Sequence, residues 1–147
     1  MAPNISIVIP VYNDAKNLER LLSSLKKQTS KDFEIIVIDD CSTDVAYDIA
    51  KKYASKFIKN KSNKGPAFSR NIGIKNSSGK IIAFTDSDCE AAIDWIDNLR
   101  RLFLDKNISV MMGKVVIPNS TFLADCISAL GFPAGGHVGF EKMWHVT

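Results

Sequence analysis

The sequence predicts an α/β fold, a three-layer α/β/α sandwich whose sheet is mainly parallel. Two runs of β-branched residues, "ISIVIPV" (5–11) and "FEIIVID" (33–39), are apolar on both faces, as strands buried under helices on either side should be. A stretch with helical periodicity lies between them, and the alternation of strand and helix then repeats along the chain. Alternating elements joined by loops of a few residues predict parallel strands with right-handed crossovers.

The first helix is predicted between these two strands from a single apolar stripe. Its members recur at the i, i+3, i+4 and i+7 spacing of one helix face: Leu18, Leu21, Leu22 and Leu25. Asn13 or Asp14 can cap its first turn, because a side-chain oxygen at that position accepts a backbone N–H that the helix leaves free. Strand, helix and strand together form the repeating unit of a parallel sheet.

A second unit follows in "CSTDVAYDIAKKYASK" (41–56). Ser42 or Thr43 can cap this helix, and Asp44 in its first turn suits the helix dipole. Its expected buried stripe consists of Val45, Ile49, Ala50 and Tyr53. A short strand at 57–58 then leads into the polar loop "KNKSNKG" (59–65).

The remaining elements complete a single expected domain over residues 1–147. Pro66 is placed to open a helix that ends at "NSSG" (76–79), after which "KIIAFTD" (80–86) forms a strand. A helix is expected around Trp95 and Leu99, a strand in "SVMMGKVVIP" (109–118), and a last helix at 122–130. The tail at 131–147 fits neither period and receives no element.

Composition and charge are those of an ordinary globular protein. The chain has 147 residues, 46% of them hydrophobic and 24% charged, with a net charge of +3. This mild excess lacks the clustered basic surface of nucleic-acid-binding proteins, so no nucleic-acid partner is expected. No run approaches the roughly 18 uninterrupted apolar residues of a spanning helix, so no membrane span is expected in this segment.

The cysteines indicate a reducing compartment. Cys41, Cys89 and Cys126 are odd in number and far apart, and they form no CxxC pair with metal spacing. The N-terminus has no positively charged segment before its apolar run, which argues against a signal peptide. We therefore expect a cytoplasmic protein, located at the cytoplasmic face of the membrane if a longer parent carries membrane helices.

Polar residues leave the carboxyl ends of three predicted strands. The stretches are "PVYND" (10–14), "DDCSTD" (39–44) and "TDSDCE" (85–90). Ligands of open parallel sheets bind beyond these ends, so we expect the chemistry there. In the second stretch, one of Asp39 and Asp40 can cap the next helix while the other faces the crevice, because successive side chains point to opposite faces.

Asp86 and Asp88 lie on either side of Ser87 at the third strand end. One interpretation is a solvated turn, which Asp and Ser favour. The other is a cation site, because two like charges held close together repel each other unless a cation joins them. Carboxylate oxygens suit Mg²⁺ or Mn²⁺, which keep positions open for water and substrate phosphates. Under the second interpretation, the carboxylates at the strand end bind a metal ion, and this ion binds a phosphate.

Basic groups occur in "NKGPAFSRNIG" (63–73). Lys64 precedes a helix whose first amides can face an anion, and Arg70 offers a planar fork for a phosphate or a base edge. The alternative is an exposed basic helix start. The chain has neither GxxxxGK[ST] nor a GxGxxG after its first strand, which argues against P-loop and Rossmann dinucleotide-binding proteins.

Four of these motifs occur in a recognisable order and spacing: "ISIVIPVYND", "IIVIDDCSTD", "NKGPAFSRNIG" and "IIAFTDSDCE…W". Together they resemble the nucleotide-binding half of family 2 glycosyltransferases, over residues 4–105. The resemblance implies the GT-A fold of nucleotide-diphospho-sugar transferases. It also implies inverting transfer of a sugar from a nucleoside-diphosphate donor, most often a UDP-sugar, to a hydroxyl of a glycan, a lipid-linked molecule or another acceptor, assisted by Mg²⁺ or Mn²⁺.

The resemblance also implies which residues form the site. Those expected to bind the nucleotide are Pro10, Val11, Tyr12, Asp40, Lys64, Gly65, Arg70, Asn71 and Asp86. Asp40 is expected to contact the base, whereas Asp39 is expected to be structural. Asp88 is the expected direct metal ligand, and Asp86 is expected to contact the ribose or a metal-bound water.

The general base of the reaction is not found in the sequence. The family supplies it as an acidic residue well after the carboxylate motif, but here Glu141 and His145 read as exposed tail residues. We expect a chain that carries the donor half and ends before the acceptor half, with the base beyond Thr147. Two alternatives stay open: a non-catalytic nucleotide- or sugar-binding module, and a sugar-nucleotide nucleotidyltransferase. The latter favours a glycine-rich basic loop after the first strand, which "PVYNDAKN" lacks.

Overall fold

Parallel strands form the sheet in the computed structural model, which describes residues 4–113. In this part of the chain the strands are β1 (Ile5–Val11), β2 (Phe33–Asp39), β3 (Lys56–Lys59) and β4 (Ile81–Phe84), in the spatial order β3-β2-β1-β4. Each neighbouring pair is parallel, which confirms the predicted α/β fold. The described residues fall into two units, 4–100 and 101–113, and the sheet belongs to the first.

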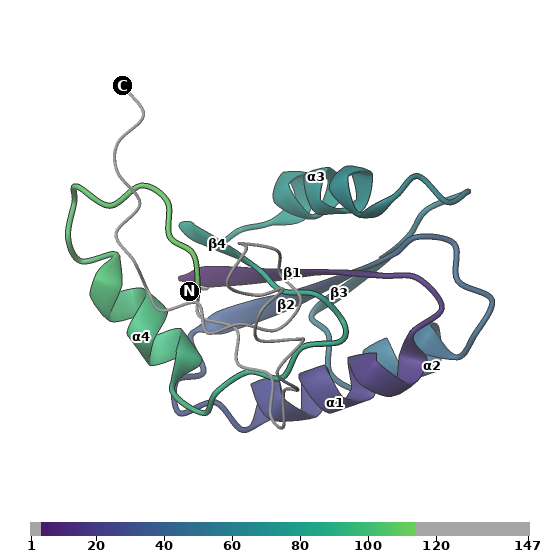
Figure 1. Ribbon diagram of the computed structural model, residues 1–147, viewed down its shortest axis with the longest axis horizontal. Coiled ribbons are helices and arrows are strands. Elements are labelled where there is room, and N and C mark those ends of the chain that lie inside the picture. The colour runs from purple at the N-terminus through teal and green to yellow at the C-terminus, as the bar shows by residue number, and fades with distance from the viewer. Residues whose placement is uncertain (1–3, 114–147) are drawn as a thin grey trace, which may run out of the picture. The chain divides into compact units, whose positions relative to one another are not determined.

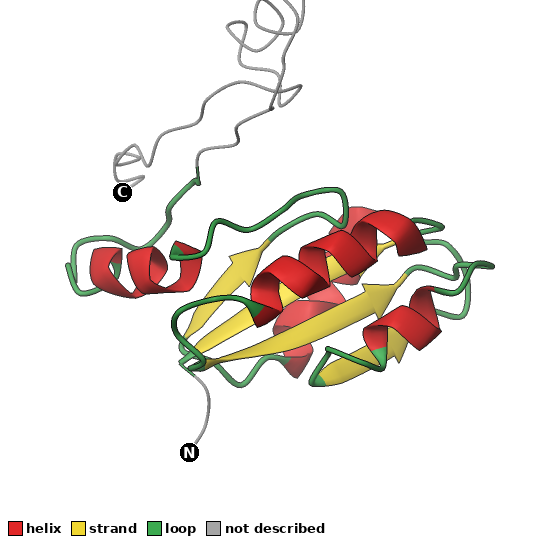
Figure 2. Ribbon diagram, turned by 90° about the horizontal axis from the view of Figure 1, so that it is seen from below, coloured by secondary structure: helices red, strands yellow, loops and turns green. Residues whose placement is uncertain are grey.

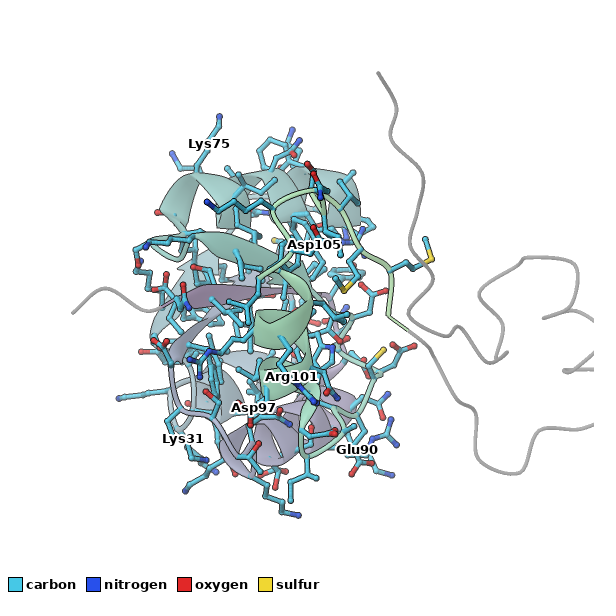
Figure 3. The ribbon with its side chains drawn as sticks, turned by 90° about the vertical axis from the view of Figure 1, so that its left-hand side faces the viewer. Lys31, Lys75, Glu90, Asp97, Arg101 and Asp105 are labelled. Carbon is cyan, nitrogen blue, oxygen red and sulfur yellow. The ribbon has the colours of Figure 1, made fainter. Side chains whose placement is uncertain are left out.

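Helices cover both faces of this sheet, as predicted. α1 (Ala15–Lys26) and α2 (Ala46–Ala50) lie on one face, and α3 (Pro66–Asn76) lies on the other (Figure 1, Figure 2). In Figure 3, Lys75 of α3 and Lys31, which follows α1, mark the two outer sides of the sandwich. A further helix, α4 (Trp95–Leu102), follows β4 in the sequence.

Apolar side chains fill the space on both sides of the sheet. Towards α3, the fully buried residues Val8, Ile36 and Ile38 pack with Ile72 and with neighbours from β3 and β4. The predicted leucine stripe of α1 is completely buried: Leu18, Leu21, Leu22 and Leu25. Burying one such side chain stabilises a fold by about 1.5–3 kcal/mol, so the helix positions are strongly determined.

Gly73 sets how closely α3 approaches β1. A Cβ atom built on Gly73 would lie 2.2 Å from Cγ1 of Val8, a separation that two carbon atoms do not adopt. A larger residue at this position would push the helix away from the sheet. Because α3 starts at the carboxyl edge of the sheet, its close seating also fixes the loop that precedes it.

The strand register brings the chain segments that follow the strands to one edge. Val11, the last residue of β1, is aligned with Asp39, the last residue of β2, which is aligned with Lys59 of β3. β4 ends earlier, with Phe84 aligned with Val8. The segment after β4 therefore passes the last residues of β1 before it leaves the sheet.

The second helix is shorter than predicted. α2 begins at Ala46, and Val45, expected in its buried stripe, is 59% exposed. The Ser42 hydroxyl does not cap this helix, because it accepts the backbone N–H of Asn13 instead (2.9 Å). Asp44 Oδ1 accepts the N–H of Ala46 (3.1 Å) and holds the start of the helix. The turn after β2 is thus ordered by the loop after β1 rather than by helix formation.

The expected caps of α1 are also wrong. Asp14 occupies the N-cap position, but its side chain makes no capping hydrogen bond. Asn13 has a φ of 50°, and its Oδ1 accepts the N–H of Thr43 (2.8 Å). The Asn13 side chain contacts a distant segment, and the Asp14 side chain contacts the distant Ser87 and the side chain of Asn17, so neither accepts a backbone N–H of the first turn.

The expected strand at 109–118 is not formed by its described residues, 109–113. Its remainder, the helix expected at 122–130 and the tail at 131–147 lie outside the described residues. Among the helices that the structure describes, none combines the length and apolar character needed to cross a membrane.

A buried carboxylate fastens the amino-terminal edge of the sheet. Glu34 of β2 accepts hydrogen bonds from Ser6 Oγ (2.7 Å) and from the N–H (2.7 Å) and Oγ (2.6 Å) of Ser78, and it pairs with Lys56 Nζ (3.1 Å). Burial alone would raise the pKa of Glu34. The hydrogen bonds from Ser78, Ser6 and Lys56 outweigh burial and lower this pKa from 4.5 to about 2. One ionised group therefore ties together β1, β2, β3 and the loop before β4.

Substitution of this carboxylate should destabilise the fold in a pH-dependent way. Glu34→Gln is expected to lower the free energy of unfolding by about 2–3 kcal/mol at neutral pH, because the amide cannot replace the charge. Since the folded pKa is depressed, the contribution is fully present above the unfolded value of 4.5 and is lost as the pH falls towards about 2. Urea unfolding of both proteins should show the difference shrinking between about pH 5 and about pH 3.

Glu19→Gln is the matched control, because it removes the same charge from an exposed position on α1. Its free energy of unfolding should stay within about 0.5 kcal/mol of the parent at every pH. An equal loss in both variants, or a Glu34→Gln difference that grows in acid, would contradict this role of Glu34.

Candidate functional site

A cleft of about 540 Å³ opens at the carboxyl edge of the sheet. Its lining comes from the end of β1, the residue after β2, the loop and first turns of α3, and the turn after β4. The lining residues are Pro10, Val11, Tyr12, Asn13, Asp14, Asp40, Asn63, Gly65, Pro66, Arg70, Asp86, Ser87 and Asp88. The volume lies in the range of clefts that hold small molecules and cofactors.

Most of the residues that the sequence predicts for the site lie together in this cleft. They are Pro10, Val11, Tyr12, Asp40, Gly65, Arg70, Asp86 and Asp88. Lys64 and Asn71 do not line it, and both are exposed. Lys64 contributes through its backbone N–H, which points to Asp40. That these residues bind a nucleotide stays a prediction.

Sequence reasoning gave no role in the site to several lining residues: Asp14, Asn63, Pro66 and Ser87. Asp14 closes the strand-end motif "PVYND", and Ser87 separates the two carboxylates of the turn after β4. The position of these two residues within the strand-end motifs was the available indication that they belong to the site. Nothing in the local sequence shows that the two residues meet.

The two carboxylates after β2 have different environments. Asp39 is 1% exposed, accepts the N–H of Ser42 (2.8 Å) and pairs with Lys59 Nζ (3.3 Å). Its contacts are those of a structural residue that fixes the turn after β2. Asp40, by contrast, lines the cleft.

Asp40 holds the loop that precedes α3. Its carboxylate accepts hydrogen bonds from Asn60 Nδ2 (2.7 Å), from the N–H of Lys64 (3.0 and 3.1 Å to the two oxygens) and from the N–H of Gly65 (2.7 Å). Burial would raise the pKa of Asp40, but these hydrogen bonds outweigh it and hold the pKa below its ordinary value. Gly65 has a φ of 85°, a backbone conformation that favours glycine, so the loop can turn its amides towards the carboxylate.

The carboxylates of the turn after β4 are more exposed. Asp86 forms an ion pair with Arg70 Nη2 (2.5 Å), which spans the cleft wall between α3 and this turn. Within the described residues, the Asp88 carboxylate accepts only a weak hydrogen bond, from the Cys89 thiol (3.8 Å). Asp88 is thus the acidic side chain of the turn that retains most of its capacity to accept a ligand.

The donor set of this turn fits a hard divalent cation. Asp86 and Asp88 offer carboxylate oxygens at the rim of the cleft, the ligand type that Mg²⁺ and Mn²⁺ prefer. No three acidic, histidine or cysteine side chains within residues 4–113 converge as a ready-made metal site. Two protein carboxylates, with water and substrate oxygens as the other ligands, would still match the way Mg²⁺ is usually held.

Asp40→Asn should disturb the loop before α3 specifically. An amide has one acceptor oxygen and places an NH₂ group where the other oxygen was. That NH₂ group then faces a donor, either Asn60 Nδ2 or the Lys64 and Gly65 N–H groups, so the hydrogen bonds around the loop are weakened. The expected loss is about 1–3 kcal/mol of folding free energy, together with faster hydrogen exchange at these two amides. Because the pKa of Asp40 is depressed, this contribution should fade as the pH falls below its ordinary range.

Asp48→Asn, at an exposed position of α2, serves as the matched control and should leave stability and both exchange rates unchanged. Unaltered exchange at Lys64 and Gly65 in Asp40→Asn would show that the carboxylate does not hold this loop.

Solved structures with the same arrangement of elements include Staphylococcus aureus TarS. Residues 1–349 of TarS in complex with UDP-GlcNAc superpose with a TM-score of 0.66 at 25% identity, covering 84% of this chain and 43% of that one. The mannosyltransferase PcManGT of Pyrobaculum calidifontis, in complex with GDP-Man and Mn²⁺, gives a TM-score of 0.69 at 22% identity, covering 82% of this chain and 37% of that one. The second likeness shows the fold alone.

The curated relatives that this chain matches are longer proteins. Glycosyltransferase AglE of Haloferax volcanii is 33% identical over 102 residues, which are 65% of this chain and 34% of AglE. Glycosyltransferase YibD of Escherichia coli is 34% identical over 110 residues, 72% of this chain and 32% of YibD. The chain thus spans about a third of the length of these two relatives. The sequence profile of "Glycosyl transferase family 2" matches residues 6–125, most of the chain, and the protein therefore belongs to glycosyl transferase family 2.

Proposed function

We propose that this chain binds the nucleoside-diphosphate part of a sugar donor in the cleft at the carboxyl edge. We further propose that the sugar is transferred with inversion to an acceptor hydroxyl, with the help of a divalent metal. The observation that carries the proposal is the meeting of Asp40, Arg70, Asp86 and Asp88 around one cleft in a member of this family. The chain spans about a third of relatives such as AglE, so the activity and the acceptor of the whole protein are part of the proposal.

A uridine nucleotide is the donor that the comparisons favour. TarS is named as a poly(ribitol-phosphate) β-N-acetylglucosaminyltransferase and is 39% identical over 90 residues, 56% of this chain and 16% of TarS. Its residues 1–349 have been solved with UDP and with UDP-GlcNAc. We extend only the nucleotide class to this chain, because the structure of TarS with UDP-GlcNAc covers 84% of it.

The cleft residues divide into two groups around such a donor. Pro10, Val11 and Tyr12 offer the end of β1 as a wall for the nucleoside, with half of the Tyr12 surface exposed. Asp40 orders the opposite wall by holding the Lys64–Gly65 segment. We retain the prediction that Lys64 and Asn71 approach the nucleotide from the exposed side of α3 and its preceding loop.

Arg70 is placed to act on the diphosphate. Its guanidinium lies at the cleft wall beside Asp86, and a planar fork of donors suits phosphate oxygens. As the sugar leaves, negative charge grows on the diphosphate, so a fixed cation stabilises the transition state more than the ground state. Arg70 therefore contributes to the rate and not only to binding.

Asp88 and Asp86 would hold the metal. When bound, a divalent cation supplies Lewis-acid stabilisation of the departing diphosphate. The case for it rests on the donor chemistry of the turn, since the solved neighbours with Mn²⁺ share only the fold with this chain. The acceptor hydroxyl also needs a base on the face of the sugar opposite the diphosphate. We assign no residue between 4 and 113 to that step.

We also propose that the protein acts in the cytoplasm, because Cys41 and Cys89 are free thiols.

Asp88→Asn should separate metal-dependent from metal-independent nucleotide binding. Thermal unfolding is measured with UDP, CDP and GDP, each with and without Mn²⁺. A nucleotide at about 100 times its Kd adds roughly 2.7 kcal/mol to stability, a rise in Tm on the order of 5–10 °C. In the parent protein the rise should be larger with Mn²⁺, and Asp88→Asn should lose that increment while it unfolds at the same temperature without ligand.

Glu90→Gln is the matched control for the loss of one negative charge. Glu90 lies two residues further along the same segment, is exposed (Figure 3) and does not line the cleft. It should keep the full metal increment. A metal increment that survives in Asp88→Asn would remove Asp88 from the metal site, and the absence of any nucleotide effect in the parent protein would overturn the proposed function.

A further inference from the structure

We propose that Asp14 is a positioning residue for the turn Asp86-Ser87-Asp88 and acts on it through Ser87. The proposal rests on the proposed function, because the turn matters to the reaction only if it binds the diphosphate and the metal. Ser87 Oγ donates a hydrogen bond of 2.7 Å to Asp14 Oδ2 across 73 residues of sequence. Both residues line the cleft, so the contact lies within the site.

Asp14 does not cap α1 through its side chain, as an aspartate at this position usually does. It occupies the N-cap position of α1, where an aspartate normally accepts a backbone N–H of the first turn. Here its side chain makes no such bond. One oxygen accepts Asn17 Nδ2 (2.7 Å) and the other accepts the Ser87 hydroxyl. A capping bond is worth about 1 kcal/mol to a helix, and the contacts with Asn17 and Ser87 take its place here.

α1 continues to hold the chain beyond the turn. Three polar side chains at intervals of four residues contact the backbone of the segment that follows Ser87. They are Arg20 Nη2 with Asp88 O (2.7 Å), Ser24 Oγ with the Ala91 N–H (3.0 Å), and Gln28 Nε2 with Ala92 O (2.6 Å). Arg20 and Ser24 lie on one face of α1, and Gln28 follows the end of the helix, so residues 88–92 run alongside α1 and the residues after it. Asp14, at the N-cap of α1, contacts the middle of the carboxylate turn itself.

An anchor at Ser87 matters most for Asp88, because Asp86 is paired with Arg70 while the Asp88 carboxylate has no strong partner of its own in the part of the chain that the structure describes. Asp86 and Asp88 are like charges in a short exposed segment. The Asp88 carboxylate has only the weak thiol contact, so its position follows from the backbone around Ser87. If the binding conformation were only a fraction of the population, the apparent affinity would fall by that fraction. Asp14 raises this fraction without contacting the ligand.

A different role for Asp14 would be direct ligation, because its carboxylate also lines the cleft. The two roles respond differently to substitution. A positioning role needs an oxygen that accepts the Ser87 hydroxyl, which Asn supplies. A ligating role needs the negative charge, which Asn lacks. The Ser87 hydroxyl is needed only for positioning.

The test measures the Kd of the full chain for UDP by calorimetry, with and without Mn²⁺. The variants are Asp14→Ala, Asp14→Asn, Ser87→Ala, Ser87→Thr and the double variant Asp14→Ala/Ser87→Ala. Ser23→Ala is the matched control, a serine of α1 that does not line the cleft. Ser87→Ala removes the hydroxyl and Ser87→Thr keeps it, so these two variants test the proposal even if Asp14→Ala does not fold.

Positioning predicts that Asp14→Ala and Ser87→Ala each weaken UDP binding in Mn²⁺ by roughly three- to tenfold, the worth of one net hydrogen bond. The double variant should lose no more than either single variant, because both remove the same contact. Asp14→Asn, Ser87→Thr and Ser23→Ala should bind within about twofold of the parent. Without Mn²⁺ all variants should bind UDP alike.

Three results would overturn the inference while the proposed function stands. These are losses that add in the double variant, a loss in Asp14→Asn as large as in Asp14→Ala, and unchanged binding in Ser87→Ala. If the parent chain binds UDP neither with nor without Mn²⁺, the proposed function fails and the inference fails with it.

Discussion

Parallel pairing of β1 with both β2 and β4 is the constraint on which the site depends. Because all the strands of the described sheet point the same way, every chain segment that follows a strand emerges at one edge. Parallel strands are apolar on both faces, so α1 and α3 must cover them from opposite sides. Both helices start at that edge, and Gly73 lets α3 lie close against Val8. Strand ends and helix starts therefore meet in one place, and the cleft lies between them.

The carboxylates gathered there differ in how far the protein satisfies them. Asp39 and Asp40 are almost fully buried, and each is surrounded by hydrogen-bond donors. A buried charge without such partners would be costly, so the donors of the neighbouring loops keep both groups stable in their ionised form. Asp88 is exposed and has a single weak contact. The contrast separates residues that build the cleft from one whose oxygens are available to a ligand.

The sequence allowed the sheet, the buried leucine stripe and most of the cleft to be predicted. The spacing of apolar residues indicates which segments are strands, and the carboxyl ends of parallel strands meet at one edge. Both features could therefore be predicted without coordinates. Predictions from neighbouring residues were wrong where a side chain or loop contacts a segment distant in the sequence. Val45 has the spacing of a buried helix residue, yet it is exposed because the helix starts one residue later. The contact of the Lys64 backbone N–H with Asp40 has no local signal either, because 24 residues separate the two in the sequence.

The failures of the capping rule carry information about function. Asn13 or Asp14 was expected to cap the first turn of α1, and neither side chain makes the capping hydrogen bond. One accepts the N–H of Thr43, and the other accepts the hydroxyl of Ser87. Each thereby joins the loop after β1 to the loop after another strand, across the cleft edge. A polar residue that abandons a favourable local bond must gain a comparable one elsewhere, because buried or half-buried acceptors seldom stay unpaired. Departures from local rules are therefore expected where loops converge on a site, and here they identify the helix that holds the carboxylate turn.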